Sequence, residues 1–156
     1  MSSERSAIEQ TLAAYCHRVD HGTANDVAAL FAEDAILKPY YDGDYDVHGR
    51  ESVRGWYAFY HEKMSENVKD LRHSISTASI EVEVDTATSV CHLTAYFTMK
   101  ADGVAYQSQG TYFDTLVRAG EIWLFQTRRI EVGFITRMGK TIQSMQPMGF
   151  PGSRFE

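Results

Sequence analysis

The chain has 156 residues, of which 44% are hydrophobic, 12% aromatic and 23% charged, a composition typical of a single globular domain with one core. Its net charge is -6 and its basic residues are scattered, so we expect no nucleic-acid partner, because phosphate binding needs clustered lysine and arginine. No apolar run approaches the roughly 20 residues that span a bilayer and the N-terminus lacks a signal-peptide core, so we expect a cytoplasmic protein without a membrane partner.

Three helices are predicted in the N-terminal part of the chain. Apolar residues at helical spacing predict the first over residues 4–20, and Gly22 follows where a helix would end. Thr23 is placed to cap a second helix that ends near Glu33. The third is predicted over residues 51–65, with one apolar stripe formed by Val53, Trp56, Tyr60 and Met64.

Strands make up most of the rest. Residues 35–41 and 44–47 flank Asp42-Gly43, a dipeptide that favours a tight hairpin. After Asn67 the apolar period changes to two, which predicts four long strands with short turns, over residues 71–84, 87–100, 104–118 and 121–137.

This order predicts an α+β roll, in which three N-terminal helices pack on a strongly curved, mainly antiparallel sheet that encloses a pocket. We assign residues 1–137 to this single domain. The tail 138–156 is rich in Pro, Gly and Met, so we expect it to be irregular and to pack on the body or on a neighbouring subunit.

The first long strand changes its alternation along its length. His73 and Ile75 share one parity, whereas Ile80 and Val82 have the other. Either a β-bulge intervenes or both faces of the sheet are buried, and the second alternative implies a homodimer or a larger homo-oligomer.

Tyr15, Asp20 and His73 are the candidate catalytic residues. A phenol donates a proton, a carboxylate orients a neighbouring base, and an imidazole accepts a proton near neutral pH. Asp20 stands in the last turn of its helix, where the helix dipole disfavours a carboxylate unless a cation such as an imidazolium compensates it. Each of these residues also has a purely structural interpretation: Tyr15 as a core residue, Asp20 as an exposed aspartate at a helix end, and His73 as a hydrogen-bonded core histidine.

Four further residues are candidates for substrate binding. Arg129 binds a substrate oxygen or pairs with an acid at the rim, and His92 is a second pocket histidine or a packing residue. Aromatic residues are expected at the pocket wall and its mouth, and these candidates are Trp56 and Tyr112.

We predict no metal and no cofactor. His17 and His21 lie four residues apart, the spacing of a shared ion, but both point away from the apolar face of their helix. Cys16 and Cys91 each lie within an apolar pattern, which favours reduced, buried thiols.

The chain resembles the SnoaL-like branch of the nuclear transport factor 2-like superfamily over roughly residues 5–137. The resemblance rests on segments spread along the chain: Ile8 to Asp20 (IEQTLAAYCHRVD), Leu30 to Asp34, Gly49, His73, Gly110 to Asp114 and Trp123 to Arg129. This superfamily includes dehydratases, polyketide cyclases and a dehydrochlorinase. Asp20 with His73 looks like the Asp-His dyad of the dehydratases, Tyr15 with Asp20 looks like the Tyr-x4-Asp pair of bile acid dehydratase, and Arg129 looks like an arginine on that enzyme's last strand.

The resemblance implies a cofactor-independent lyase, dehydratase-like, that acts on a small hydrophobic ring compound by His/Asp acid-base catalysis. A SnoaL-like cyclase and an isomerase similar to ketosteroid isomerase use the same groups without losing water. A third alternative is a non-catalytic binding module, similar to the small subunits of ring-hydroxylating dioxygenases.

Overall fold

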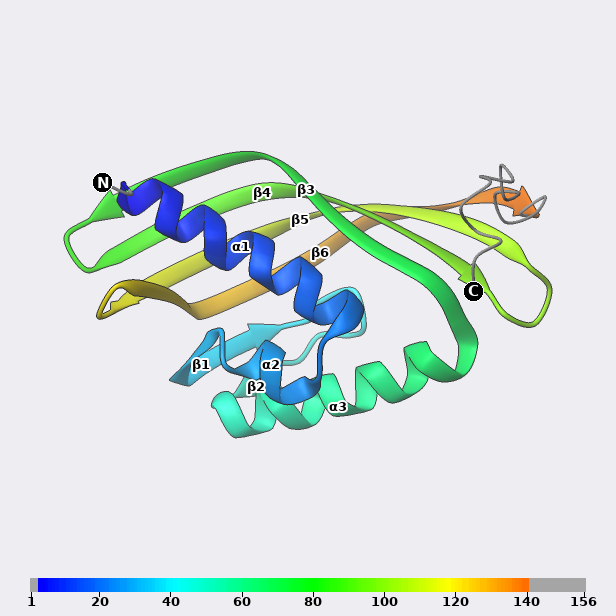
Figure 1. Cartoon of the computed structure of the whole chain (residues 1–156), viewed down its shortest axis with the longest axis horizontal. Coiled ribbons are helices and arrows are strands. Elements are labelled where there is room, and N and C mark those ends of the chain that lie inside the picture. The colour runs from blue at the N-terminus through cyan, green and yellow to red at the C-terminus, as the bar shows by residue number, and fades with distance from the viewer. Residues whose placement is uncertain (1–2, 141–156) are drawn as a thin grey trace, which may run out of the picture.

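A computed structural model describes residues 3–140, in which three helices cover one face of a six-stranded sheet (Figure 1). The elements in chain order are α1 (Glu4–His21), α2 (Ala24–Ala28), β1 (Phe31–Lys38), β2 (Val47–His48), α3 (Arg50–Asn67), β3 (Val68–Glu83), β4 (Thr86–Met99), β5 (Val104–Ala119) and β6 (Ile122–Lys140). This is the predicted α+β roll, and its sheet is curved but not closed.

Helix α1 forms where the periodicity predicts it. The Ser3 side chain caps it by accepting a hydrogen bond from the Ser6 N–H, 3.2 Å away. Its buried side chains lie on one face and begin the main core, and α1 contacts β3 and β6 through this face. The helix ends at His21, and the Gly22 N–H donates back to the carbonyl of Arg18.

The second helix is shorter than predicted. Thr23 and Asp26 form a capping box, but α2 ends at Ala28 instead of near Glu33. The chain enters β1 at Phe31, whose fully buried ring packs in the core beside Phe125, its partner on β6. Tertiary packing therefore overrides the local helical pattern at Phe31.

The predicted tight hairpin around Asp42-Gly43 is wrong. Strands β1 and β2 pair antiparallel with Ile36 opposite His48, so residues 39–46 form a longer loop. Pro39 follows β1 directly and lacks an N–H for the ladder, which explains why pairing stops there. The Trp56 indole then holds the loop to α3 by donating to the Tyr45 hydroxyl at 2.9 Å.

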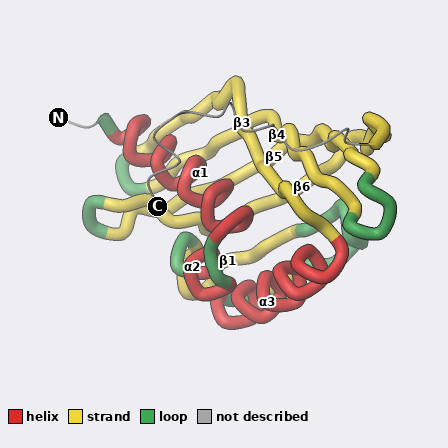
Figure 2. Tube along the Cα trace, turned by 45° about the vertical axis from the view of Figure 1, so that its right-hand side comes forward, coloured by secondary structure: helices red, strands yellow, loops and turns green. Residues whose placement is uncertain are grey.

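The strand order of the sheet is β2-β1-β6-β5-β4-β3, in which β3 to β6 form an antiparallel meander and β1 runs parallel to β6. The four long strands agree with the prediction within a few residues. Strand β6 reaches Lys140, past residue 137, so Met138 belongs to the sheet and not to an irregular tail. The prediction for the rest of the tail lies outside the described residues. Figure 2 shows how strongly the long strands bend around the face that the helices cover.

A β-bulge explains the change of alternation in β3. The register with β4 shifts between Ser76 and Ser79, where Thr77 adopts a φ of 55°. The bulge keeps Ile75 and Ile80 in contact with the same core although their parities differ. The apolar residues of β3 can therefore all face one core, and a second buried face of the sheet is not needed to explain them. The homodimer stays a prediction, but the alternation of β3 no longer supports it.

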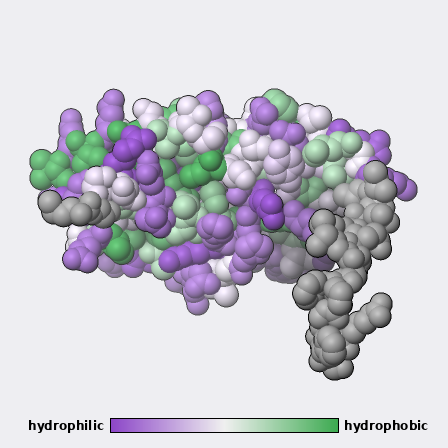
Figure 3. Space-filling model, turned by 45° about the horizontal axis from the view of Figure 1, so that its top comes forward, coloured by the Kyte–Doolittle hydropathy of each residue, from purple (hydrophilic) through white to green (hydrophobic). Residues whose placement is uncertain are grey.

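The outer surface is mostly hydrophilic on the face that Figure 3 shows, and apolar side chains gather near the end that carries the β3–β4 turn. Val84, at that turn, is 82% exposed. Among residues 3–140, no helix is long and apolar enough to cross a membrane.

Candidate functional site

A cavity of about 460 Å³ lies between α1, α3 and the concave face of the sheet. Strands β3 to β6 supply a largely apolar wall, and five phenols line the cavity: Tyr15, Tyr41, Tyr57, Tyr60 and Tyr112. A mostly apolar cavity with a few convergent polar groups is the usual form of a small-molecule site.

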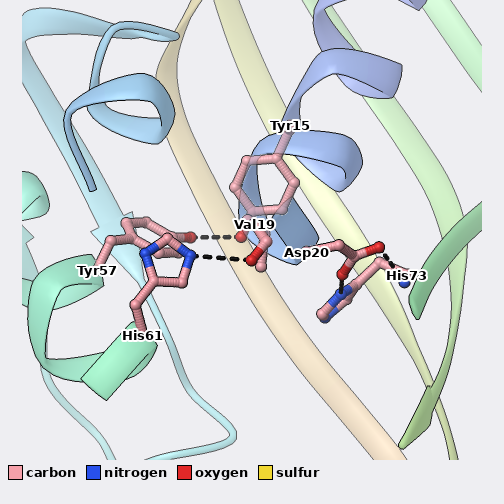
Figure 4. Close-up of polar contacts among 6 residues, drawn as sticks. All are labelled: Tyr15, Val19, Asp20, Tyr57, His61 and His73. Atoms are coloured by element: carbon pink, nitrogen blue, oxygen red, sulfur yellow. Dashed lines mark hydrogen bonds and ion pairs between the residues drawn. The ribbon is translucent and has the colours of Figure 1, made fainter. Parts of the chain in front are cut away.

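Asp20 and His73 meet at the wall of this cavity (Figure 4). His73 Nδ1 lies 2.5 Å from one Asp20 carboxylate oxygen, and the His73 backbone N–H donates to the other at 2.8 Å. The two side chains are only 11% and 5% exposed. Because an ionised carboxylate only accepts hydrogen bonds, Nδ1 carries the proton and Nε2 of the neutral ring is left as an acceptor.

Two elements hold this pair in place. Asp20 stands in the last turn of α1, and His73 lies inside β3, which begins earlier than predicted, at Val68. The register of β3 with β4 shifts on both sides of His73, between Lys69 and Arg72 and again beyond Ser76. The two hydrogen bonds from His73 to Asp20 therefore tie this short regular segment to the helix.

Tyr15 lies deep in the cavity wall, where its hydroxyl shares a short hydrogen bond with the hydroxyl of Tyr57 (Figure 4). Burial raises the pKa of Tyr15 to about 12, so the phenol is neutral and keeps its proton at physiological pH. Tyr57, on α3, was not among the predicted site residues. It stands four residues after Val53, a spacing that places both on the buried face of a helix, so the sequence did contain a signal for it.

Of the two aromatic residues predicted for substrate binding, Tyr112 lines the cavity and Trp56 lies behind its wall. Tyr112 lines the cavity, and burial raises its pKa well above the usual value. Trp56 does not line it. Its indole stacks on Tyr60 with ring centroids 5.6 Å apart and supports the lining tyrosines from outside.

Arg129 and His92 are outside the cavity, contrary to prediction. Arg129 pairs with Glu131 at 3.2 Å and lies over the ring of Phe113. His92 is exposed because its neighbours Cys91 and Leu93 point to the core, and alternate strand residues face opposite sides. Neither side chain contributes to the cavity wall.

The arginine that the fold buries is Arg128. Its guanidinium is fully buried and pairs with Asp114 through two hydrogen bonds, of 2.9 and 3.0 Å. It also lies 4.0 Å from the Tyr15 ring centroid, 3.9 Å from that of Tyr112 and 4.2 Å from that of Phe125.

A bulge at Gln126 determines that Arg128, and not Arg129, points into the core. In the register of β5 with β6, Thr115 pairs with Thr127 but Leu116 pairs with Phe125, so one residue of β6 is inserted. The insertion reverses the alternation and turns Arg128 to the core. Asp114 was the available signal, since an acid between the apolar positions Tyr112 and Leu116 needs a buried cation.

The metal-ligand types are dispersed in this structure. His17 and His21 are both exposed, and no group of three His, Cys, Asp or Glu side chains within residues 3–140 is placed to hold a metal ion. Cys16 and Cys91 are buried free thiols, and burial raises the pKa of each to about 11, which keeps them protonated and unreactive at neutral pH.

The SnoaL-like domain model matches residues 1–129, and the chain belongs to this family. No protein with curated annotation matches the sequence.

Solved structures with the same fold have diverse names. One is a candidate scytalone dehydratase from Novosphingobium aromaticivorans, with 22% identity, a TM-score of 0.74 and coverage of 94% of this chain and 93% of the other. A second is the type 2 hexachlorocyclohexane dehydrochlorinase LinA, with 15% identity, a TM-score of 0.74 and coverage of 93% and 94%. A third, Aln2 from a Streptomyces species, has 22% identity, a TM-score of 0.70 and coverage of 81% and 89%. At these identities the likeness shows the fold alone.

Proposed function

We propose that this protein is a cofactor-independent lyase, dehydratase-like, that removes water from a small hydrophobic ring compound. The observation that carries the proposal is the 2.5 Å contact between His73 Nδ1 and the Asp20 carboxylate at the wall of an apolar cavity. The contact leaves Nε2 free as a base, and both the family and the names of two structural neighbours are consistent with elimination chemistry.

In the proposed reaction His73 Nε2 takes a proton from an acidic carbon beside a carbonyl group. The electron pair of the C–H bond forms the new double bond, and the C–O bond to the leaving hydroxyl breaks. The Tyr15 phenol gives its proton to that hydroxyl, which departs as water, and the imidazolium then returns a proton to the Tyr15 oxygen through solvent. The Asp20 carboxylate stabilises the imidazolium while it exists.

Tyr15 suits the donor role because it is both neutral and fixed. Its hydroxyl is held by Tyr57, and its ring packs edge-on against Phe31, Tyr57, Tyr112 and Phe125. A phenol held in this way loses little conformational freedom when a substrate binds.

A non-catalytic subunit is the less favoured alternative. No side chain of residues 3–140 fills the cavity, and Tyr15, Tyr57 and His73 stand in its wall, whereas a binding module or dioxygenase-like small subunit has no need for a held imidazole there. The cyclase and isomerase alternatives share the proton-abstraction step, so they differ from the dehydratase only in whether water is lost.

The test uses a ring ketone with acidic hydrogens beside its carbonyl. Protein and 2-tetralone are incubated in D2O at neutral pH, and exchange of those hydrogens is followed by proton NMR. We expect the wild type to accelerate the exchange and His73→Gln to abolish the acceleration. His92→Gln, on the opposite face of the sheet, is the matched control and should keep it.

Exchange by His73→Gln at the wild-type rate would refute His73 as the base. Thermal-shift screening of hydroxylated ring ketones then identifies compounds that bind. Release of water from a bound compound, seen as a new conjugated chromophore, distinguishes the dehydratase from the isomerase.

A further inference from the structure

Ser108 is one of the few polar side chains in the sheet wall of the cavity. The residue is 8% exposed and lines the cavity, and its hydroxyl makes no hydrogen bond to another of the described residues. We propose that Ser108 forms a hydrogen-bonding subsite for an oxygen substituent of the ring substrate, on the side of the ring away from the carbon that faces His73. This inference rests on the proposed function, because it assumes a ring substrate whose reacting carbon lies at His73.

The sheet register places Ser108 and His73 in one row across the cavity wall. His73 on β3 pairs with Ala95 on β4, and Ala95 pairs with Ser108 on β5. Neighbouring strands lie about 4.8 Å apart, so the two residues are separated by roughly 10 Å along the sheet. Ala95 between them has a short side chain, which leaves the space above it to a ligand.

The neighbours of Ser108 supply no competing polar group. In the same row its partner on β6 is Ile135, and the next row toward the core has Leu93 and Val132 on either side of Gly110. Of the cavity-lining residues on β4, β5 and β6, only Ser108 and Tyr112 carry a hydrogen-bonding side chain. A ligand that lies on this wall and extends beyond Tyr112 therefore finds Ser108 as its hydrogen-bonding partner on these strands.

The Ser108 hydroxyl opens into the cavity, so a ligand that fills this space must either pair with it or leave it unsatisfied. The chain offers a matched comparison in Ser89, on the same face of the sheet. Its hydroxyl is buried and without a partner among the described residues, and Ser89 does not line the cavity. Substitution of each serine by alanine removes the same group, and only one of the two changes touches the ligand site.

These positions define the chemical class of ligand. It is a ring compound, large enough to extend from His73 toward Ser108, with a carbonyl beside its acidic carbon and a hydroxyl or second carbonyl at the far end. Ser108 and its neighbours Ala95 and Ile135 carry no charge, and Lys63, which also lines the cavity, pairs with Glu66, so we expect the far group to be neutral.

The experiment compares two probes that differ by one hydroxyl, 2-tetralone and 6-hydroxy-2-tetralone. Their dissociation constants are measured by calorimetry with the wild type, Ser108→Ala and Ser89→Ala. We expect the wild type to bind the hydroxylated probe more tightly. Ser108→Ala should weaken that probe about two- to tenfold, the range for one net hydrogen bond, and leave 2-tetralone unchanged.

Ser89→Ala should bind both probes as the wild type does. Ser89→Ala should melt at or above the wild-type temperature, since it loses a buried unsatisfied hydroxyl, and Ser108→Ala should melt close to the wild type. An equal effect of Ser108→Ala on the two probes, an unchanged preference, or no binding of either probe to the wild type would overturn the subsite.

The outcome is separable from that of the proposed function. A preference that depends on Ser108 without catalysed hydrogen exchange would support the subsite and refute the lyase. Exchange that depends on His73 without any Ser108-dependent preference would do the reverse.

Discussion

The guanidinium carbon of Arg128 lies 4.0 Å from the centre of the Tyr15 ring, so a buried cation stands directly behind a phenol of the cavity wall. The cation favours the ionised phenol and burial opposes it. Burial has the larger effect, and the pKa of Tyr15 is raised to about 12. Tyr15 is therefore a protonated donor whose conjugate base would be formed next to a positive charge.

The first prediction concerns the pair formed by Asp20 and His73, which we propose to be catalytic. Asp20→Asn and His73→Gln should each lower turnover by about two orders of magnitude, the scale of general-base catalysis. The double variant should lose little more than either single variant, because the two residues act as one unit. Turnover and urea unfolding are measured on all three proteins. Additive losses of a few-fold that follow stability would show a structural pair.

Tyr15→Phe should lower turnover while the protein stays folded. The substitution keeps the ring that packs against Phe31 and Phe125 and removes only the hydroxyl, at a cost of about 1 kcal/mol for the lost bond to Tyr57. The matched control is Tyr106→Phe, which lies outside the cavity lining. Equal turnover of the two variants would remove Tyr15 from the mechanism.

Stability should depend on Arg128 far more than on its neighbour Arg129. Arg128→Met leaves the Asp114 carboxylate buried without its partner, which typically costs about 3 to 5 kcal/mol. Arg129→Met breaks a surface pair whose side chains are 39% and 47% exposed. Such pairs contribute roughly 0 to 1 kcal/mol. Chemical unfolding of the two variants measures the difference, and similar losses would contradict the burial of Arg128.

The free energy of unfolding should fall in alkaline solution. Below pH 10 Tyr15 is protonated in both states, whereas between pH 10 and about 12 the unfolded chain releases the proton and the folded chain keeps it. The fall from this residue alone is about 2 to 3 kcal/mol, at about 1.4 kcal/mol per pKa unit. In Tyr15→Phe the free energy of unfolding should fall less steeply between pH 10 and about 12 than in the wild type. An equal slope in the two proteins would contradict the raised pKa of Tyr15.

The sequence predicts those helices and strands whose formation depends on the local spacing of apolar side chains. The helical face from Ile8 to Val19 and the period-two strands follow from side-chain spacing alone, and they place most of the fold. The Asp20–His73 contact joins positions far apart in sequence; the helix dipole indicates only that Asp20 needs a compensating partner, and the resemblance to the SnoaL-like family pointed to His73.

What the sequence does not reveal is where the alternation is interrupted. A single inserted residue at Gln126 exchanges the environments of Arg128 and Arg129, and nothing in the local composition marks it. The early start of β1 has the same kind of cause, because Phe31 is placed by Phe125, a residue remote in the chain. Ser108 likewise becomes noticeable only when the register shows that it shares a row with His73.

The two register shifts of β3 separate the position of the His73 imidazole from the rest of its strand. Because the pairing with β4 is interrupted both before Arg72 and after Ser76, the segment between these breaks is fixed by its own ladder bonds and by Asp20. We therefore expect that an added or deleted residue beyond Ser79 changes the pairing at the nearer break and leaves His73 on the same face of the sheet. The far end of the strand is thus free to vary in length and shape while the contact between His73 and Asp20 is retained.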